Sequence, residues 1–297
     1  MRKEIYYLRT CLMYVVLLLT SFIVHAQQHP IQLLSRADSA VIPFASVLFE
    51  SRKLGFHTDE QGRFSITSKQ AVDTIKIRAI GFGDTILIIN KAHIKPNFII
   101  FLEPNSTILQ EVKVFSGNKS FTSMKPRKTG ELQQWGGVGS QYGLLLDEEK
   151  LMGRKMTKVH FYLAHGGNFN YPFRIRIYSI KHGKPDIELT KESIVVRANH
   201  KGWNEFEISQ YDLFVPDSGC LVAMEWLNFE NLVSVDLILT QGKYAGQVLG
   251  MGDFGNRYMG FVKDDFSPWH FNGDYLPRYQ LPDKSKFMNP MIRLTVK

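Results

Sequence analysis

Apolar and polar residues alternate with a period of two along most of the chain, which is the pattern of β-strands that place one face on a core. The clearest case starts with the alternation at 45–49, continues through Asp59-Glu60-Gln61-Gly62, and ends in a second alternation from Phe64. The four middle residues have turn chemistry, and Gly62 is free to adopt a positive φ. We therefore predict a β-hairpin over residues 42–64.

The same pattern predicts further strands at 75–79, 159–163, 173–177, 194–196, 206–208, 221–227, 233–239 and 291–296. In the strand at 173–177, the polar positions are Arg174 and Arg176. Residues 86–89 and 98–102 are instead continuous apolar runs, which are typical of strands covered on both faces. The sequence shows no convincing amphipathic helix, so the predicted fold class is all-β.

Four short motifs stand in order in the first part of the chain: Pro43-Phe44-Ala45, Thr58 to Phe64, Ile80-Gly81-Phe82 and Leu102-Glu103-Pro104. In this order they resemble the carboxypeptidase regulatory-like domain, over roughly residues 28–115. The resemblance implies a transthyretin-like β-sandwich of the type found in secreted bacterial proteins. It also implies a folding and interaction module rather than a catalyst.

The region from residue 130 onward has short strands separated by long loops, which favours a two-sheet jelly-roll-like β-sandwich. Its strand pattern at 173–178 and 203–215 is loosely similar to galactose-binding-like jelly rolls. The predicted organisation has four parts: a signal peptide at 1–26, the carboxypeptidase regulatory-like domain at 27–115, a polar linker at 116–129 and the jelly-roll-like domain at 130–297.

The first 26 residues have the composition of a secretory signal peptide. Arg2, Lys3 and Arg9 precede an apolar run over 11–24, and Ala26 ends a cleavage site with small residues. An uncleaved membrane anchor is the alternative, but the run is shorter than the ~20 residues that a spanning helix needs. We therefore expect an exported protein in the periplasm, on the outer cell surface or outside the cell, without a membrane span after cleavage.

The chain of 297 residues has a formal net charge of +8. Part of this excess lies around the predicted linker, where a solvated tether is favoured over contact with an anionic envelope surface. No nucleic-acid-binding signature is present, so no nucleic-acid partner is expected. Cys220 is the one cysteine left after cleavage, which excludes an intramolecular disulfide, and its apolar neighbours predict a core position.

His57 and Glu60 have the His-x-x-Glu spacing of the zinc ligands in zinc carboxypeptidases. A catalytic zinc needs three protein ligands and an open position for water. Here the pair lies inside the turn motif of a regulatory-like module, and the catalytic domain that the enzyme requires is missing. We interpret the spacing as a coincidence within a turn, and we predict no catalytic residues.

Aromatic and polar residues are interleaved between residues 246 and 275. Aromatic rings stack on sugars or anchor protein partners, and neighbouring carboxylates and amides orient hydroxyl groups. The predicted ligand-binding residues are four aromatic anchors and two polar partners: Trp269, Tyr258, Phe254, Tyr275, Asp265 and Asn272. The alternative is a loop packed over the sandwich by its own aromatic rings.

Asp264, Asp265 and Asp274 in the same segment are compatible with a structural calcium ion, and no other cofactor or metal is predicted. The predicted function is that of a secreted or cell-envelope binding protein, without catalysis, that recognises a glycan or an envelope protein through this segment. An assembly scaffold stays open, and it would show an exposed apolar patch without a ligand cleft. A hydrolase also stays open, and it would need bound zinc or a carboxylate pair in a cleft.

Overall fold

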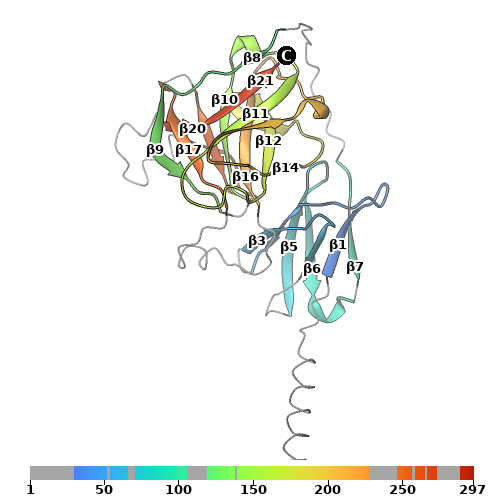
Figure 1. Ribbon diagram of the computed structural model, residues 1–297. Helices are drawn as coiled ribbons and strands as arrows, with labels where there is room; N and C mark the ends of the chain where they lie inside the picture. The colour runs from blue at the N-terminus through green and yellow to red at the C-terminus, as the bar shows by residue number, and fades with distance from the viewer. Residues whose placement is uncertain are drawn as a thin grey trace, which may run out of the picture.

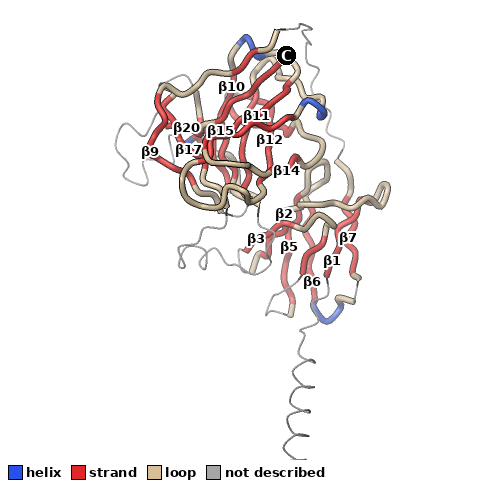
Figure 2. The backbone as a smooth tube through the Cα atoms, viewed as in Figure 1, coloured by secondary structure: helices blue, strands red, loops and turns tan. Residues whose placement is uncertain are grey.

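The computed structural model describes residues 30–51, 54–65, 71–95, 97–105, 119–137, 139–227, 246–255, 258–264, 266–272 and 288–297. The predicted signal peptide and the predicted strand at 233–239 lie outside these ranges. Figure 1 shows two β-rich domains stacked on each other, the N-terminal one in blue and cyan and the C-terminal one in green to red. Strands dominate both domains (Figure 2), and the helical elements of the described residues are short 3-10 turns, η1 (Lys91–His93), η2 (Glu149–Leu151) and η3 (Ser209–Tyr211). No described helix is long and apolar enough to cross a membrane.

The N-terminal domain consists of two sheets. The first has the order β4-β1-β7, in which β1 and β7 are parallel. The second has the order β3-β2-β5-β6 and is antiparallel. The strands are β1 (Pro30–Ser35), β2 (Ser46–Phe49), β3 (Leu54–His57), β4 (Arg63–Ser65), β5 (Val72–Arg78), β6 (Thr85–Asn90) and β7 (Phe98–Leu102).

The predicted hairpin over 42–64 is wrong in its pairing. β2 pairs with β3, which follows it closely, whereas β4 pairs with β1 in the other sheet. The predicted turn at Asp59 to Gly62 therefore exists but carries the chain from one sheet to the other. β3 was missed because Leu54-Gly55-Phe56-His57 is too short and too irregular to show a period of two.

A core cluster lies between the two sheets, and Leu33, Val47 and Ile77 are fully buried in it. The prediction that 86–89 and 98–102 are covered on both faces is wrong, since Ile86 is 62% exposed and Ile88 is 77% exposed. β6 and β7 each end the order of a sheet. One face of each strand meets the core, and the other remains open.

The C-terminal domain also consists of two sheets. One has the order β13-β12-β16-β10-β18-β19, with β14 beside β12, and we call it the interface sheet. Its strands are β10 (Gln141–Leu146), β12 (Phe173–Lys181), β13 (Lys184–Glu188), β14 (Ile194–Val196), β16 (Cys220–Trp226), β18 (Gly260–Lys263) and β19 (His270–Phe271).

The other sheet has the order β20-β17-β11-β21-β8, with β15 beside β11 and β9 beside β17. Its strands are β8 (Phe121–Thr122), β9 (Lys128–Gln134), β11 (Met156–Leu163), β15 (Gly202–Glu207), β17 (Leu249–Asp253), β20 (Met288–Pro290) and β21 (Ile292–Val296). Residues of both sheets, such as Ile177 and Leu294, share one buried core. Cys220 lies in this core, as predicted, and burial raises its pKa to about 12.

The predicted linker at 116–129 extends too far. β8 pairs with β21, and the Ser123 hydroxyl accepts a hydrogen bond of 3.0 Å from the backbone N–H of Leu294. β9 begins at Lys128 and pairs with β17. Residues 119–129 therefore belong to the C-terminal domain. Their polar composition is that of an edge strand and the loop that follows it, not that of a tether. Residues 116–118 lie outside the described ranges.

Candidate functional site at the domain interface

Two motifs of the N-terminal domain fold against each other at one end of its sandwich. The backbone N–H of Ala45 donates to Thr58 Oγ1 at 2.9 Å, and the backbone N–H of Thr58 donates to the Ala45 carbonyl at 2.9 Å. Within the turn, Asp59 Oδ1 accepts hydrogen bonds from the backbone N–H groups of Gln61 and Arg63 at 2.9 and 2.7 Å. These bonds fix the shape of this end of the domain.

This end of the N-terminal domain packs on the outer face of the interface sheet. Arg174, Arg176 and Glu225 alternate with core residues along β12 and β16, and all three are buried. The sequence pattern predicted that the two arginines point away from the core of their own domain. In the structure they face the other domain rather than solvent. His57, the last residue of β3, reaches across the interface and places Nε2 at 3.3 Å from Glu225 Oε1.

Glu225 is the centre of a buried ion cluster. Its Oε2 lies 3.2 Å from Arg174 Nη1 and 3.1 Å from Arg176 Nη1. Arg174 Nη2 also donates to the carbonyl of Phe44, and Arg176 Nη2 pairs with Glu188 Oε2 at 2.7 Å. Charge-assisted hydrogen bonds thus join the Phe44 segment and β3 to the interface sheet.

The charges in this cluster determine how its acids titrate. Burial by itself raises the pKa of Glu225, but the charges of Arg174 and Arg176 and the contact with His57 outweigh burial and hold this pKa far below its usual range. Glu188 has the opposite balance, since burial raises its pKa and Arg176 offsets only part of the rise. Glu225 is therefore anionic at neutral pH and acts as a structural counter-ion.

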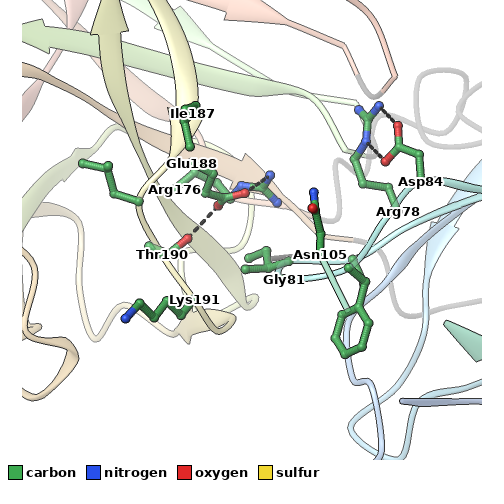
Figure 3. A pocket seen from close by; sticks show the side chains of 13 residues that line it. Arg78, Gly81, Asp84, Asn105, Arg176, Ile187, Glu188, Thr190 and Lys191 are labelled. Carbon is green, nitrogen blue, oxygen red and sulfur yellow. Dashed lines mark hydrogen bonds and ion pairs between the residues drawn. The ribbon is translucent and has the colours of Figure 1, made fainter. Parts of the chain in front are cut away.

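A first cleft, of about 460 Å³, opens between the two domains beside this cluster. Figure 3 shows Arg78 and Asp84 on one side and Arg176, Glu188 and Thr190 on the other. Arg78 donates two hydrogen bonds to Asp84, of 2.9 and 2.5 Å, and Thr190 donates to Glu188 at 2.7 Å. Most charged groups of the first cleft are therefore already paired within the protein.

A second cleft, of about 700 Å³, opens along the same interface. Phe44, Glu60 and Gln61 line it from the N-terminal domain, and Arg197 and Tyr211 line it from the C-terminal domain. Among the described residues, the side chains of Glu60 and Gln61 and the Tyr211 hydroxyl make no hydrogen bond or ion pair with the protein. The second cleft thus offers aromatic rings together with a carboxylate, an amide and a hydroxyl that are available to a ligand.

Phe44 is held in place at the second cleft. Its φ of 57° is a left-handed backbone conformation that is unfavourable for a residue with a bulky side chain. The hydrogen bond from Arg174 to its carbonyl secures this conformation. The ion cluster therefore helps to position a residue of the cleft wall.

The aromatic segment predicted to bind a ligand is largely packed onto the protein. Phe254 and Tyr258 are 2% and 4% exposed, and their ring centroids lie 5.2 Å apart. Asn272 is 1% exposed and accepts a hydrogen bond from Tyr142. These three side chains are covered, so the prediction that they contact a ligand is corrected. Their positions agree with the alternative prediction, in which the segment packs over the sandwich through its own aromatic rings.

Trp269, another predicted anchor, remains partly exposed. Its ring meets Tyr178 edge-on with centroids 5.2 Å apart, and Lys263 Nζ lies 5.3 Å from its centroid. Close by in the sequence, the ring of Phe266 contacts the guanidinium of Arg78 across the domain interface, at 4.6 Å. The segment therefore covers part of the outer face of the interface sheet and takes part in the domain contact.

Two predicted binding residues, Asp265 and Tyr275, lie outside the described residues, as does Asp274 of the predicted calcium site. Asp264 is described, and it accepts a hydrogen bond of 3.0 Å from Ser140 Oγ. Within the described ranges, no three His, Cys, Asp or Glu side chains gather in a way that would hold a metal ion. Calcium binding stays a prediction.

Residues 32–114 match the family model of the CarboxypepD_reg-like domain. The N-terminal domain is a carboxypeptidase regulatory-like domain. Comparison of the chain with curated proteins finds no match. A solved structure of the cysteine protease and lectin-like domains of Cwp84, a surface layer associated protein of Clostridium difficile, is similar at 8% identity and a TM-score of 0.38. The similarity covers 92% of this chain and 55% of that structure, so the chain spans little more than half of its length.

In the regulatory-like domain, the His-x-x-Glu pair is divided between two environments. His57 is buried, with Nε2 at 3.3 Å from both Ser46 Oγ and Glu225 Oε1. Glu60 is exposed at the second cleft. The contact across the domain interface accounts for His57 without a metal ion. That the spacing is a coincidence stays a prediction.

The sequence pattern does not predict that the residues lining the second cleft form a site. Arg197 belongs to no motif, and Tyr211 lies in the stretch 203–215, whose loose similarity to jelly rolls indicated no site. Both are far in the sequence from the surface of the regulatory-like domain that they face. The one available signal was the pair of motifs at 43–45 and 58–64, which the resemblance had singled out. It marked the correct edge of the domain but not what that edge contacts.

Proposed function

We propose that the protein is an exported binding protein, without catalysis, that recognises a glycan or a protein partner in the second cleft. The observation that carries this proposal is the set of available polar groups beside aromatic rings in an open cleft built by two firmly joined domains. The volume of the cleft is in the range typical of ligand sites. Export rests on the predicted signal peptide.

The chemistry of the second cleft favours a glycan over a protein partner. The rings of Phe44 and Tyr211 suit the apolar face of a sugar, and Glu60 and Gln61 suit its hydroxyl groups. The cleft has its shape before a ligand binds. The hydrogen bond from Arg174 holds the Phe44 carbonyl, and the hydrogen bond from the Gln61 backbone N–H to Asp59 holds the turn. A preorganised site loses less free energy on binding than a site that must be ordered.

The test is a binding screen of residues 27–297 against glycans and envelope polysaccharides, followed by calorimetric titration of variants. We expect Glu60→Gln and Tyr211→Ala each to weaken binding by about tenfold, since each removes a contact to the ligand. Glu149→Gln is the matched control, because Glu149 is an exposed acid that does not line the cleft, and it should bind like the wild type.

Trp269→Ala separates this proposal from the sequence-based one. Full binding in Trp269→Ala together with loss in Tyr211→Ala supports the second cleft. The reverse result would move the site to the aromatic segment, and loss of binding in EDTA would then point to calcium. Release of cleaved product from a bound glycan would contradict the proposal that the protein has no catalytic activity.

A further inference from the structure

β6 forms an open edge of the regulatory-like domain. It is the last strand in the order β3-β2-β5-β6, and no other described strand pairs with its outer side. Ile86 and Ile88 on its outer face are 62% and 77% exposed, and Val72 on the neighbouring β5 is 49% exposed. Such an edge presents unpaired backbone N–H and C=O groups to any strand that approaches it.

The sequence of β6 contains nothing that would block such an approach. Edge strands usually carry a charge, a proline or a bulge that prevents pairing with another chain. β6 reads Thr-Ile-Leu-Ile-Ile-Asn, without a charge or a proline, and its register with β5 has no bulge. Its continuous apolar run is typical of a strand covered on both faces, but in the single chain the outer face of this strand is exposed.

Two basic side chains of β5 near this edge, Lys76 and Arg78, are paired with acids of the same domain. Lys76, opposite Ile86 on β5, pairs with Glu50 at 2.5 Å, and Arg78 pairs with Asp84 at 2.5 Å. Two identical copies of this edge can therefore approach each other without bringing Lys76 and Arg78 together as unpaired like charges. This favours a second copy of the chain as the occupant, despite the net charge of +8.

An apolar groove of about 390 Å³ lies beside the edge, between β6 and β7. Ile88, Ile99 and Phe101 are among the residues that line it, and the last two are 41% and 38% exposed. The groove gives side chains of a partner strand an apolar surface to pack against. The outer face of β6 and this groove thus form one apolar contact surface.

We propose that two copies of the protein associate through antiparallel pairing of their β6 strands. Because side chains alternate between the faces of a strand, residues that lie opposite each other must share a face. A two-fold axis at Leu87 meets this condition and places Ile86 of one copy opposite Ile88 of the other. The two four-stranded sheets then continue into one sheet, and the edge disappears. This association is independent of the ligand proposed for the second cleft.

The test is sedimentation velocity of residues 27–297 over a series of concentrations. We expect a dimer for the wild type, and a dissociation constant raised by about tenfold or more in Ile88→Lys, because a lysine on an edge strand opposes pairing. Met259→Lys is the matched control, since Met259 is an exposed apolar residue of the C-terminal domain at 38% exposure, and it should behave like the wild type. Circular dichroism verifies that each variant is folded.

A crosslinking experiment tests the register. The double variant I86C/I88C should form a disulfide-linked dimer under oxidising conditions, whereas Ile86→Cys alone should not, because its partner position is then an isoleucine. A wild type that is monomeric at every concentration would overturn the proposal, as would a dimer that Ile88→Lys leaves intact. Equal crosslinking of the single and the double variant would overturn the register.

Discussion

Glu225 illustrates at the scale of one residue how the two domains are joined. It lies on β16 opposite Arg174 on one side and Gln141 on the other, and its carboxylate meets two arginines and His57. Removing one partner of a buried ion pair leaves an uncompensated charge without water, which costs more than the pair itself contributes. Loss of the Glu225 charge would therefore leave Arg174 and Arg176 buried with too little compensation.

We predict that Glu225→Gln destabilises the protein by about 3–5 kcal/mol at neutral pH. The folded-state pKa of Glu225 lies below its unfolded value, so its stabilising contribution is fully present above the unfolded value and is lost as pH falls through the folded one. The difference between wild type and variant should therefore be constant at neutral pH and shrink only below pH about 4.5. Urea unfolding at a series of pH values measures it.

Glu205→Gln is the control for this prediction. Glu205 pairs with Lys158 at 2.5 Å, but its side chain is 51% exposed, and exposed pairs contribute about 1 kcal/mol or less. Equal losses of stability in the two variants would show that the buried cluster has no special role in joining the domains.

At the scale of the element, the turn from Asp59 to Gly62 holds β3 and β4 at the edge that meets the C-terminal domain. Gly62 has a φ of 65°, and a Cβ there would lie 2.8 Å from the carbonyl oxygen of Ile42 and 3.0 Å from that of Leu33. Both the backbone conformation and the close approach therefore require glycine. Gly183 has a similar φ of 72° but no atom within 4 Å of a Cβ position.

We predict that Gly183→Ala costs about 1 kcal/mol from its backbone conformation alone, and that Gly62→Ala costs about 1–3 kcal/mol more because of the close contacts. The measurement is the free energy of unfolding of both variants in the same denaturant series. Equal costs would mean that the turn shifts easily, and that it does not fix the wall of the second cleft.

At the scale of the whole molecule, the buried ion cluster predicts that the two domains unfold together. The regulatory-like domain has its own core, but its His57 end and the outer face of the interface sheet are buried only while the domains are in contact. Separating them would expose the paired charges and leave a small sandwich on its own, which would have limited stability.

This prediction can be tested with probes that report on one domain each. The four tryptophans, Trp135, Trp203, Trp226 and Trp269, all belong to the C-terminal domain, and hydrogen exchange of the β5 amides reports on the regulatory-like domain. In the wild type, the denaturation midpoints from the two probes should coincide, and in Glu225→Gln they should separate. Separate midpoints in the wild type would contradict the prediction that the two domains unfold together.

The sequence by itself determined the all-β class and the alternation of most strands, because period-two patterns and turn residues are local. The regulatory-like domain came from the resemblance of its ordered motifs to a family, which the family model confirms. The sequence also determined that Arg174 and Arg176 point away from the core of their own domain. Tertiary structure alone decided that both arginines meet Glu225, that His57 of the other domain contacts the same carboxylate, and that Arg174 bonds the Phe44 carbonyl. The period-two pattern indicates on which face of a strand a residue lies, but it does not indicate what covers that face.

The same reason explains the errors in the predicted site. Phe254 and Tyr258 have the composition of a binding loop, but both are buried in the core. Composition does not distinguish a ring that meets a ligand from a ring that meets its own chain. Conversely, the apolar residues of β6 looked like those of a covered strand, and the fold left their outer face exposed. Contacts between distant segments, which depend on the packing of the two domains, decide both cases.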